Sequence, residues 1–227
     1  MTIPRNDALA RTLPFGLFIL LLAARGLVES EAASLGHAVD ARWLYALQAG
    51  IPLLVMLRYR NRYEELHDAP RSAGAWILAA LAGTAVLLFW ISPIAAWARL
   101  DDRAASFSPL TPAGDLDWGL ILARTTGAVL VVPVMEELFW RSFLLRWLER
   151  RSFLEVSPAR TGRFALLASS GVFALAHDLW LAGFLAGLVY TLLYRRLGNL
   201  WYCVIAHATT NLLLAAWVVA TRSWEYW

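Results

Sequence analysis

The sequence predicts an all-α fold: a polytopic transmembrane helix bundle of about seven spans (six to eight), with a cytoplasmic N-terminus. Hydrophobic residues make up 59% of the chain and charged residues 16%, with a mean hydropathy of +0.55. Soluble domains contain only about 45–50% apolar and about 25% charged residues. Apolar stretches close to the roughly 18 residues needed to cross a bilayer recur along the whole length. Because only short polar breaks separate them, residues 1–227 are predicted to form a single integral membrane domain.

Seven segments are apolar enough to serve as spans, with bounds expected to hold within several residues. The first is predicted to stay in place as a span, because no small-residue cleavage site lies before the acidic pair Glu29 and Glu31. The fourth is longer than a bilayer requires. The segments are residues 13–28, 40–57, 74–97, 118–149, 162–180, 181–196 and 199–221.

The arginines predict the orientation. Thirteen lie in the N-terminal tail and in the connections after the second, fourth and sixth spans, and four lie at the opposite ends. Since positive residues accumulate on the cytoplasmic side, the N-terminus is predicted to be cytoplasmic. The thirteen are Arg5, Arg11, Arg58, Arg60, Arg62, Arg71, Arg146, Arg150, Arg151, Arg160, Arg163, Arg195 and Arg196; the four are Arg42, Arg99, Arg103 and Arg222.

Composition also excludes several kinds of site. Cys203 is the only cysteine, so neither an intrachain disulfide nor a thiolate metal cluster can form. The net charge of +3 comes from arginines spread over several connections, so no nucleic-acid partner is expected. Membrane lipids are the partner that the composition itself implies.

The fourth span contains two adjacent carboxylates, Glu136 and Glu137. A charge near the bilayer centre costs roughly 2.5–3.5 kcal/mol on insertion scales, so this pair is a candidate functional site. Glu137 and Arg141 are four residues apart and share a helix face, which gives Glu137 a counter-ion. Glu136 points about 100° away and is left free to face a cavity, beside a helix that Pro133 is expected to kink. The alternative is a snorkelling charge cluster at the end of the span.

Polar residues with the same four-residue spacing occur in two further spans. Phe173 and His177 share a face of the fifth span, where the alternative is an interfacial or hydrogen-bonded histidine. Approximate depths place His177 nearer the outer side than Glu136. His207 and Asn211 share a face of the last span, where the alternative is an interhelical hydrogen bond.

Together the three sets are more informative than any one of them, because they use only residue types suited to acid–base work, metal binding or oxyanion stabilisation. Hydrolysis of a peptide needs a base for water and donors for the oxyanion. Glu136 with His177, and His207 with Asn211, could fill these roles. Residues 118–221 are therefore predicted to be the catalytic core.

The ordered motifs EExxxR, FxxxH and HxxxN resemble the signature of the type II CAAX prenyl endopeptidase family, also called CPBP or Abi. They stand here as Glu136-Glu137 with Arg141, Phe173 with His177, and His207 with Asn211. The compact size is similar to the bacterial members associated with exosortase systems. The resemblance implies a helical intramembrane protease, here placed in a bacterial inner membrane, that cleaves a membrane-associated protein or peptide, lipidated in some members.

Two mechanisms are implied by the resemblance. In the first, Glu136 and His177 activate water and His207 with Asn211 binds the oxyanion, with Glu137 and Arg141 as further site residues. In the second, a metal such as zinc is held by Glu136, His177 and His207. The first is favoured, with no cofactor required, because no HExxH pair is present and asparagine is a poor zinc ligand. The competing function is a non-proteolytic scaffold or immunity module in which these residues act as interhelical glue.

Overall fold

A computed structural model describes residues 5–34, 40–69, 72–92, 94, 97–100 and 107–227. Arg71 and Arg103, which entered the orientation count, lie outside these ranges. So do residues 93, 95 and 96, near the end of the predicted 74–97 span.

The predicted all-α class is confirmed, and each predicted span corresponds to a helix or, for residues 118–149, to a continuous series of helical turns. The helix over the predicted 74–97 span ends at residue 90, seven residues earlier than expected. The helices are α1 (Arg5–Ser34), α2 (Leu44–Tyr59), α3 (Ala73–Trp90), α5 (Trp118–Thr126), α6 (Val132–Glu137), α7 (Leu145–Trp147), α8 (Arg163–Leu175), α9 (Trp180–Leu197) and α10 (Leu200–Thr221).

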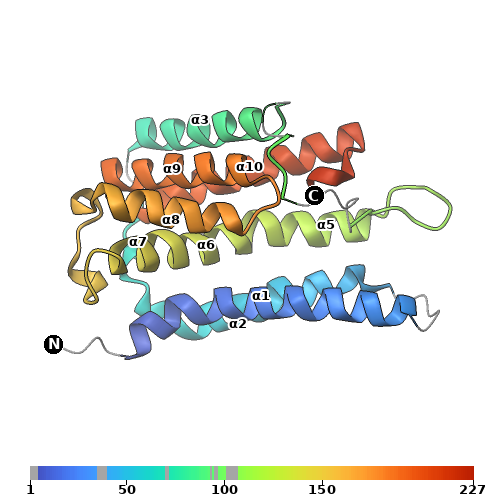
Figure 1. Cartoon of the computed structure of the whole chain (residues 1–227), viewed down its shortest axis with the longest axis horizontal. Helices are drawn as coiled ribbons and strands as arrows, with labels where there is room; N and C mark the ends of the chain where they lie inside the picture. The colour runs from blue at the N-terminus through green and yellow to red at the C-terminus, as the bar shows by residue number, and fades with distance from the viewer. Residues whose placement is uncertain (1–4, 35–39, 70–71, 93, 95–96, 101–106) are drawn as a thin grey trace.

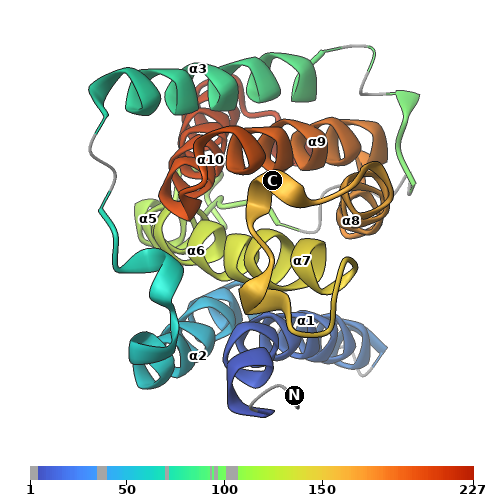
Figure 2. The ribbon, with the colours of Figure 1, turned by 90° about the vertical axis from the view of Figure 1, so that its left-hand side faces the viewer.

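The helices form layers. Figure 2 shows α1 and α2 on one side, the series α5–α6–α7 in the middle, α8, α9 and α10 beyond it, and α3 on the far side. Successive helices run in alternate directions, so the N-terminus and the α7–α8 connection lie at one end and the C-terminus lies toward the other (Figure 1). The arginine-rich connections therefore share one end of the bundle, as the orientation prediction requires.

Four helices within the described residues are long and apolar enough to cross a membrane: Asp7–Glu31, Ala73–Trp90, Trp118–Trp147 and Leu200–Thr221. Large apolar side chains on the outside of the bundle are exposed, including Leu27, Leu54, Leu81 and Phe164. Such surfaces suit lipid and not water. The chain is therefore an integral membrane protein. That α2, α8 and α9 also cross the membrane stays a prediction.

The middle series is interrupted by two π-helical stretches, Gly127–Val131 and Leu138–Leu144, on either side of α6. Pro133 follows the first of them and cannot donate a backbone hydrogen bond, which favours wider turns before it. The wider turns change which side chains share a face, and π-helical turns often occur at functional sites.

Glycines allow the helices to pack closely around this series. A Cβ atom on Gly83 of α3 would collide with the carbonyl oxygen of Ala206 in α10. A Cβ on Gly187 of α9 would lie 3.0 Å from the Cα of Ser170 in α8. The Gly183-xxx-Gly187 segment of α9 therefore packs closely on α8.

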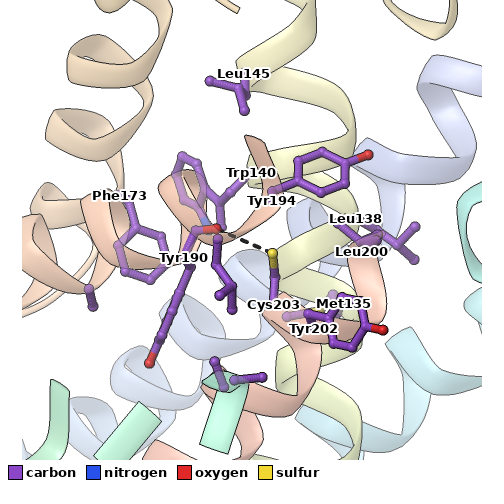
Figure 3. Close-up of a cluster of buried hydrophobic side chains, with 14 of the residues drawn as sticks. Met135, Leu138, Trp140, Leu145, Phe173, Tyr190, Tyr194, Leu200, Tyr202 and Cys203 are labelled. Carbon is purple, nitrogen blue, oxygen red and sulfur yellow. Dashed lines mark hydrogen bonds between the residues drawn. The ribbon is translucent and has the colours of Figure 1, made fainter. Parts of the chain in front are cut away.

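An apolar core of buried side chains from the middle series, α8, α9 and α10 lies inside the bundle (Figure 3). Trp140, Leu145 and Tyr194 are each at most 4% exposed there. The thiol of Cys203 donates a hydrogen bond to the carbonyl oxygen of Tyr190 at 3.2 Å. The cysteine is therefore a packed core residue.

The arginine-rich end is held by a buried ionic network that the sequence did not reveal. Arg11 of α1 is fully buried and donates to both carboxylate oxygens of Glu65, at 2.9 and 2.6 Å. Ser142 and Arg146, from the end of the middle series, also bond to Glu65. The network joins α1, the α2–α3 connection and α7 at the predicted cytoplasmic surface.

Candidate active site

Helix α6 separates the two adjacent carboxylates as predicted. Glu137 is fully buried and lies 3.0 Å from Nη1 of Arg141, so the predicted ion pair is confirmed. Glu136, at 9% exposure, lines a cavity instead. Its Oε2 atom is buried without a hydrogen-bond partner among the described residues. A buried carboxylate oxygen needs a donor, and water in the cavity can supply it.

Glu137 holds a second partner besides Arg141. Its Oε1 atom lies 2.9 Å from Nδ1 of His207 in α10. Because an ionised carboxylate can only accept, Nδ1 of His207 carries the proton in this bond and Nε2 is left for the cavity. Glu137 therefore orients the histidine and compensates Arg141.

Arg141 is enclosed on its sides by aromatic rings. Its guanidinium lies 4.5 Å from the ring centroid of Phe173 and 5.2 Å from that of Tyr190. Cation–π contacts of this kind stabilise a desolvated arginine. The phenylalanine of the FxxxH motif thus contacts the arginine of the EExxxR motif as well as the histidine of its own motif.

His177 lies in the turn after α8 and not on the helix, because α8 ends at Leu175, so the predicted 162–180 helix is too long by five residues. The four-residue relationship survives through the backbone: Nδ1 of His177 lies 2.8 Å from the carbonyl oxygen of Phe173. Since a carbonyl only accepts, Nδ1 donates, and Nε2 in the neutral ring keeps a lone pair. The sequence placed His177 nearer the outer side of the membrane than Glu136, and the short helix removes this difference in depth. Thirteen helical residues place His177 only about 20 Å from the start of α8.

Asn211 of α10 follows His207 by one helical turn. Its Nδ2 atom donates to the carbonyl oxygen of Ala128, at 2.7 Å, within the first π-helical stretch. A primary amide carries two N–H groups, so one remains for another acceptor. The residue therefore joins α10 to the middle series and still lines the cavity.

The motif residues meet at a cavity of about 100 Å³, which is large enough for several water molecules. Glu136, His177, His207 and Asn211 line it, and Glu137 and Arg141 stand behind them. The structure thus brings all six predicted site residues together from three segments of the chain. Base-type groups and hydrogen-bond donors that face the same small cavity can perform proton transfer on a water molecule that enters it.

Tyr190 and Thr210 are cavity residues that were not predicted. The Tyr190 ring stacks on His207, with a centroid separation of 5.3 Å and an interplanar angle of 22°. Its hydroxyl lies 2.7 Å from Oγ1 of Thr210, which donates to the carbonyl oxygen of Gly83 at 2.8 Å. This chain of contacts fixes the histidine ring against α9 and α3.

Trp90, at the end of α3, also lines the cavity and had not been predicted. Its ring meets His177 edge-on, with centroids 5.4 Å apart. In the sequence, Trp90 is one of several tryptophans near the ends of spans, and no sequence pattern distinguishes it from the others as a cavity residue. The repetition of Gly183, Gly187 and Tyr190 on one face of α9 could have indicated the tyrosine.

The second mechanism requires Glu136, His177 and His207 to hold a metal ion together. Within the part of the chain that the structure describes, no group of three or more His, Cys, Asp or Glu side chains is placed to hold a metal. The Nδ1 atoms of His207 and His177 are engaged by Glu137 and by a backbone carbonyl oxygen, which leaves the Nε2 atom of each ring open to the cavity. Metal independence therefore stays a prediction.

Residues 118–213 match the family model described as "Type II CAAX prenyl endopeptidase Rce1-like". The matched segment begins at the start of α5 and includes all three motifs. Searches of curated proteins and of solved structures gave no significant match. The resemblance seen in the sequence is thus confirmed, and it covers the C-terminal segment that builds most of the cavity.

Proposed function

We propose, from the match of residues 118–213 to the Rce1-like type II CAAX prenyl endopeptidase family model, that the chain is an intramembrane endopeptidase in which Glu136 and His177 activate water. The observation that carries the proposal is the unpartnered carboxylate oxygen of Glu136, buried in a cavity that His177, His207 and Asn211 also line. A general base needs to reach the proton that it removes directly or through one water.

In the first step, a water molecule lies between Glu136 and Nε2 of His177. Glu136 takes one proton of the water while its oxygen attacks the carbonyl carbon of the scissile peptide bond. His177 accepts a hydrogen bond from the second water proton and so orients a lone pair toward the carbon. The hydrogen bond from Nδ1 of His177 to Phe173 supports this role, because it holds the ring in the tautomer that accepts at Nε2.

In the second step, the carbonyl oxygen becomes an oxyanion. Nε2–H of His207 and the free N–H of Asn211 are the donors for it. Glu137 supports the role of His207, because its carboxylate accepts the proton of Nδ1 and so holds the ring with Nε2 toward the cavity. Preorganised donors of this kind contribute about 10²–10³ in rate for each one removed in known cases.

In the last step, the carbon–nitrogen bond of the tetrahedral intermediate breaks. Glu136 returns its proton to the leaving nitrogen, which becomes a free amine, and the carbonyl carbon ends as a carboxylic acid. The water is thereby divided between the two products and the site returns to its starting state. None of these steps requires a metal ion or another cofactor.

The substrate is proposed to be a membrane-associated protein or peptide. The cavity lies within the bundle, so the scissile bond has to enter the membrane region to reach it. A lipid chain on the substrate would hold it there, and a lipidated substrate is the form that the family description names. We place the chain in a bacterial inner membrane, with lipids as its surroundings.

The proposal is tested by comparing new protein termini in the membrane proteome of bacteria that express the wild type or Glu136→Gln. The substitution keeps the side-chain volume and removes the base, so we expect wild-type-specific termini to fall about 10²-fold or more in the variant. The protein level in the membrane serves as the control. Equal sets of termini from both chains would contradict the proposal.

A second function, a non-proteolytic scaffold or immunity module, is favoured by two interhelical bonds. The contacts of His207 with Glu137 and of Asn211 with Ala128 join α10 to the middle series, as polar glue would. Under this function, His207→Leu would lower stability or assembly, and no wild-type-specific termini would be found.

A further inference from the structure

A second cavity, of about 300 Å³, adjoins the first at its outer end. The two share two lining residues, Trp90 and His177, so these side chains form the partition between them. The rest of the second cavity is formed by the α8–α9 turn, by Arg99, by Leu22 of α1, and by the C-terminal residues 225–227. His177 is therefore reached from both sides.

The second cavity lies at the end of the bundle opposite the arginine-rich connections. The α8–α9 turn and the C-terminal residues belong to the end that the positive-inside rule places outside the cytoplasm. Four arginines of the sequence were assigned to that end, against thirteen at the other. The cavity is thus directed to the non-cytoplasmic side.

The cytoplasmic end of the site is closed by contrast. Arg141, Trp140 and Leu145 are at most 4% exposed beneath Glu137. The ion pair of Arg11 with Glu65 lies beyond them, and Arg11 is also fully buried. A polypeptide arriving from the cytoplasm would have to break this packed and ion-paired layer.

The second cavity has the mixed lining expected of a peptide-binding surface. Aromatic rings of Trp90 and Tyr226 stand beside the charged groups of Arg99, Asp178 and Glu225. Arg99 lies over the Tyr226 ring at 5.7 Å, and within the described ranges neither carboxylate forms an ion pair with it. At the rim, the backbone N–H of Leu100 donates to the carbonyl oxygen of Asp178. Charged side chains and backbone at the rim suit a polypeptide better than a lipid tail.

We propose that the second cavity is the route by which a polypeptide substrate reaches Glu136 from the non-cytoplasmic side of the membrane. This inference rests on the proposed protease function and adds to it the side of access. Trp90 and His177, which form the partition between the cavities, are the side chains that the substrate has to pass. A substrate whose cleavage site is exposed outside the cytoplasm is accordingly the class that this chain processes.

The route is tested by blocking it with a bulky, membrane-impermeant maleimide. Cys203 is fully buried, so an introduced cysteine is labelled selectively. Ala176→Cys places the thiol on the wall of the second cavity, and Ser157→Cys places it at the opposite end of the bundle as a matched control. The readout is the rate at which one new protein terminus is formed: the most abundant terminus that the wild type produces and Glu136→Gln does not.

In right-side-out vesicles we expect Ala176→Cys to be labelled and Ser157→Cys to stay unlabelled. Labelling of Ala176→Cys should lower the cleavage rate about tenfold or more, because the reacting groups are no longer reached. Labelling of Ser157→Cys in inverted vesicles should leave the rate unchanged. Full activity of labelled Ala176→Cys, or its labelling only in inverted vesicles, would overturn the inference.

Failure of the route and failure of the protease function are separable. If Glu136→Gln is inactive while labelled Ala176→Cys remains active, the route alone is wrong. If Glu136→Gln yields the same termini as the wild type, the protease function itself is wrong.

Discussion

Oε1 of Glu137 lies 2.9 Å from Nδ1 of His207, a contact between side chains separated by 70 positions in the sequence. The same oxygen lies 3.0 Å from Arg141. One carboxylate atom thus connects the EExxxR motif to the HxxxN motif. Its neighbour Glu136 makes neither contact, and this difference separates a structural glutamate from the proposed base.

Glu137→Gln is expected to lower stability strongly, whereas Glu136→Gln is expected to preserve it. Loss of the Glu137 charge leaves Arg141 buried without its ionic partner, a change that typically costs about 3–5 kcal/mol. Thermal unfolding of the two variants in detergent micelles measures the difference. Equal stability of the two would show that the ion pair contributes little.

Gly83→Ala is expected to destabilise the bundle by about 1–3 kcal/mol, because the new methyl group meets the backbone of Ala206. It should also lower cleavage, since α10 carries His207. Gly171→Ala is the matched control: its Cβ meets nothing within 4 Å, so it should be neutral or stabilising by up to about 1 kcal/mol. The measurement is the denaturation midpoint of each variant. Similar midpoints for Gly83→Ala and Gly171→Ala would be inconsistent with tight packing of α3 on α10.

Arg11→Ala is expected to cost about 3–5 kcal/mol, because it leaves the buried carboxylate of Glu65 without its main partner. Arg150→Ala provides the comparison. That arginine pairs with Glu155 at 3.8 Å on the surface, where ion pairs contribute little. The two variants are compared by urea unfolding monitored by tryptophan fluorescence, and a small effect of Arg11→Ala would argue against the network.

The same network predicts a pH dependence. Burial raises the pKa of Glu65, but the hydrogen bond and charge of Arg11 and the hydroxyl of Ser142 outweigh it and hold the pKa below 4.5. A depressed pKa in the folded state stabilises the protein above the unfolded value, and this stabilisation is lost as the pH falls through the folded value. The stability difference between the wild type and Glu65→Gln should therefore narrow as the pH falls below 4.5. If the stability difference between the wild type and Glu65→Gln instead widened in acid, the pKa of Glu65 would not be lowered in the folded protein.

Chelation is expected to leave cleavage unchanged. The described residues hold no group of three or more His, Cys, Asp or Glu side chains placed to bind a metal. The measurement is the yield of the wild-type-specific termini in membranes washed with EDTA. Loss of cleavage that zinc restores would favour the metal mechanism with Glu136, His177 and His207.

Sequence spacing predicted the motif pairs because residues four apart on a helix share a face whatever surrounds them. It could not predict the contact of Glu137 with His207, which depends on how α6 and α10 pack. Arg11 and Glu65 were also missed, since an arginine in a tail and a glutamate in a connection resemble solvated charges. The end of α8 was placed too late because apolar residues resume at Leu179, after His177 and Asp178, while the backbone already turns after Leu175.

The shortness of α8 has a consequence for the surrounding lipid. Thirteen residues extend about 20 Å, whereas the hydrocarbon core of a bilayer is about 30 Å thick. The outer face of this helix carries Phe164, Leu167 and Leu175, all strongly exposed, which keep lipid tails in contact with it. A bilayer adapts to so short an apolar surface by thinning. The membrane beside His177 should therefore be dimpled, so that bulk water and a partly unwound substrate segment approach the reactive carboxylate across less hydrocarbon.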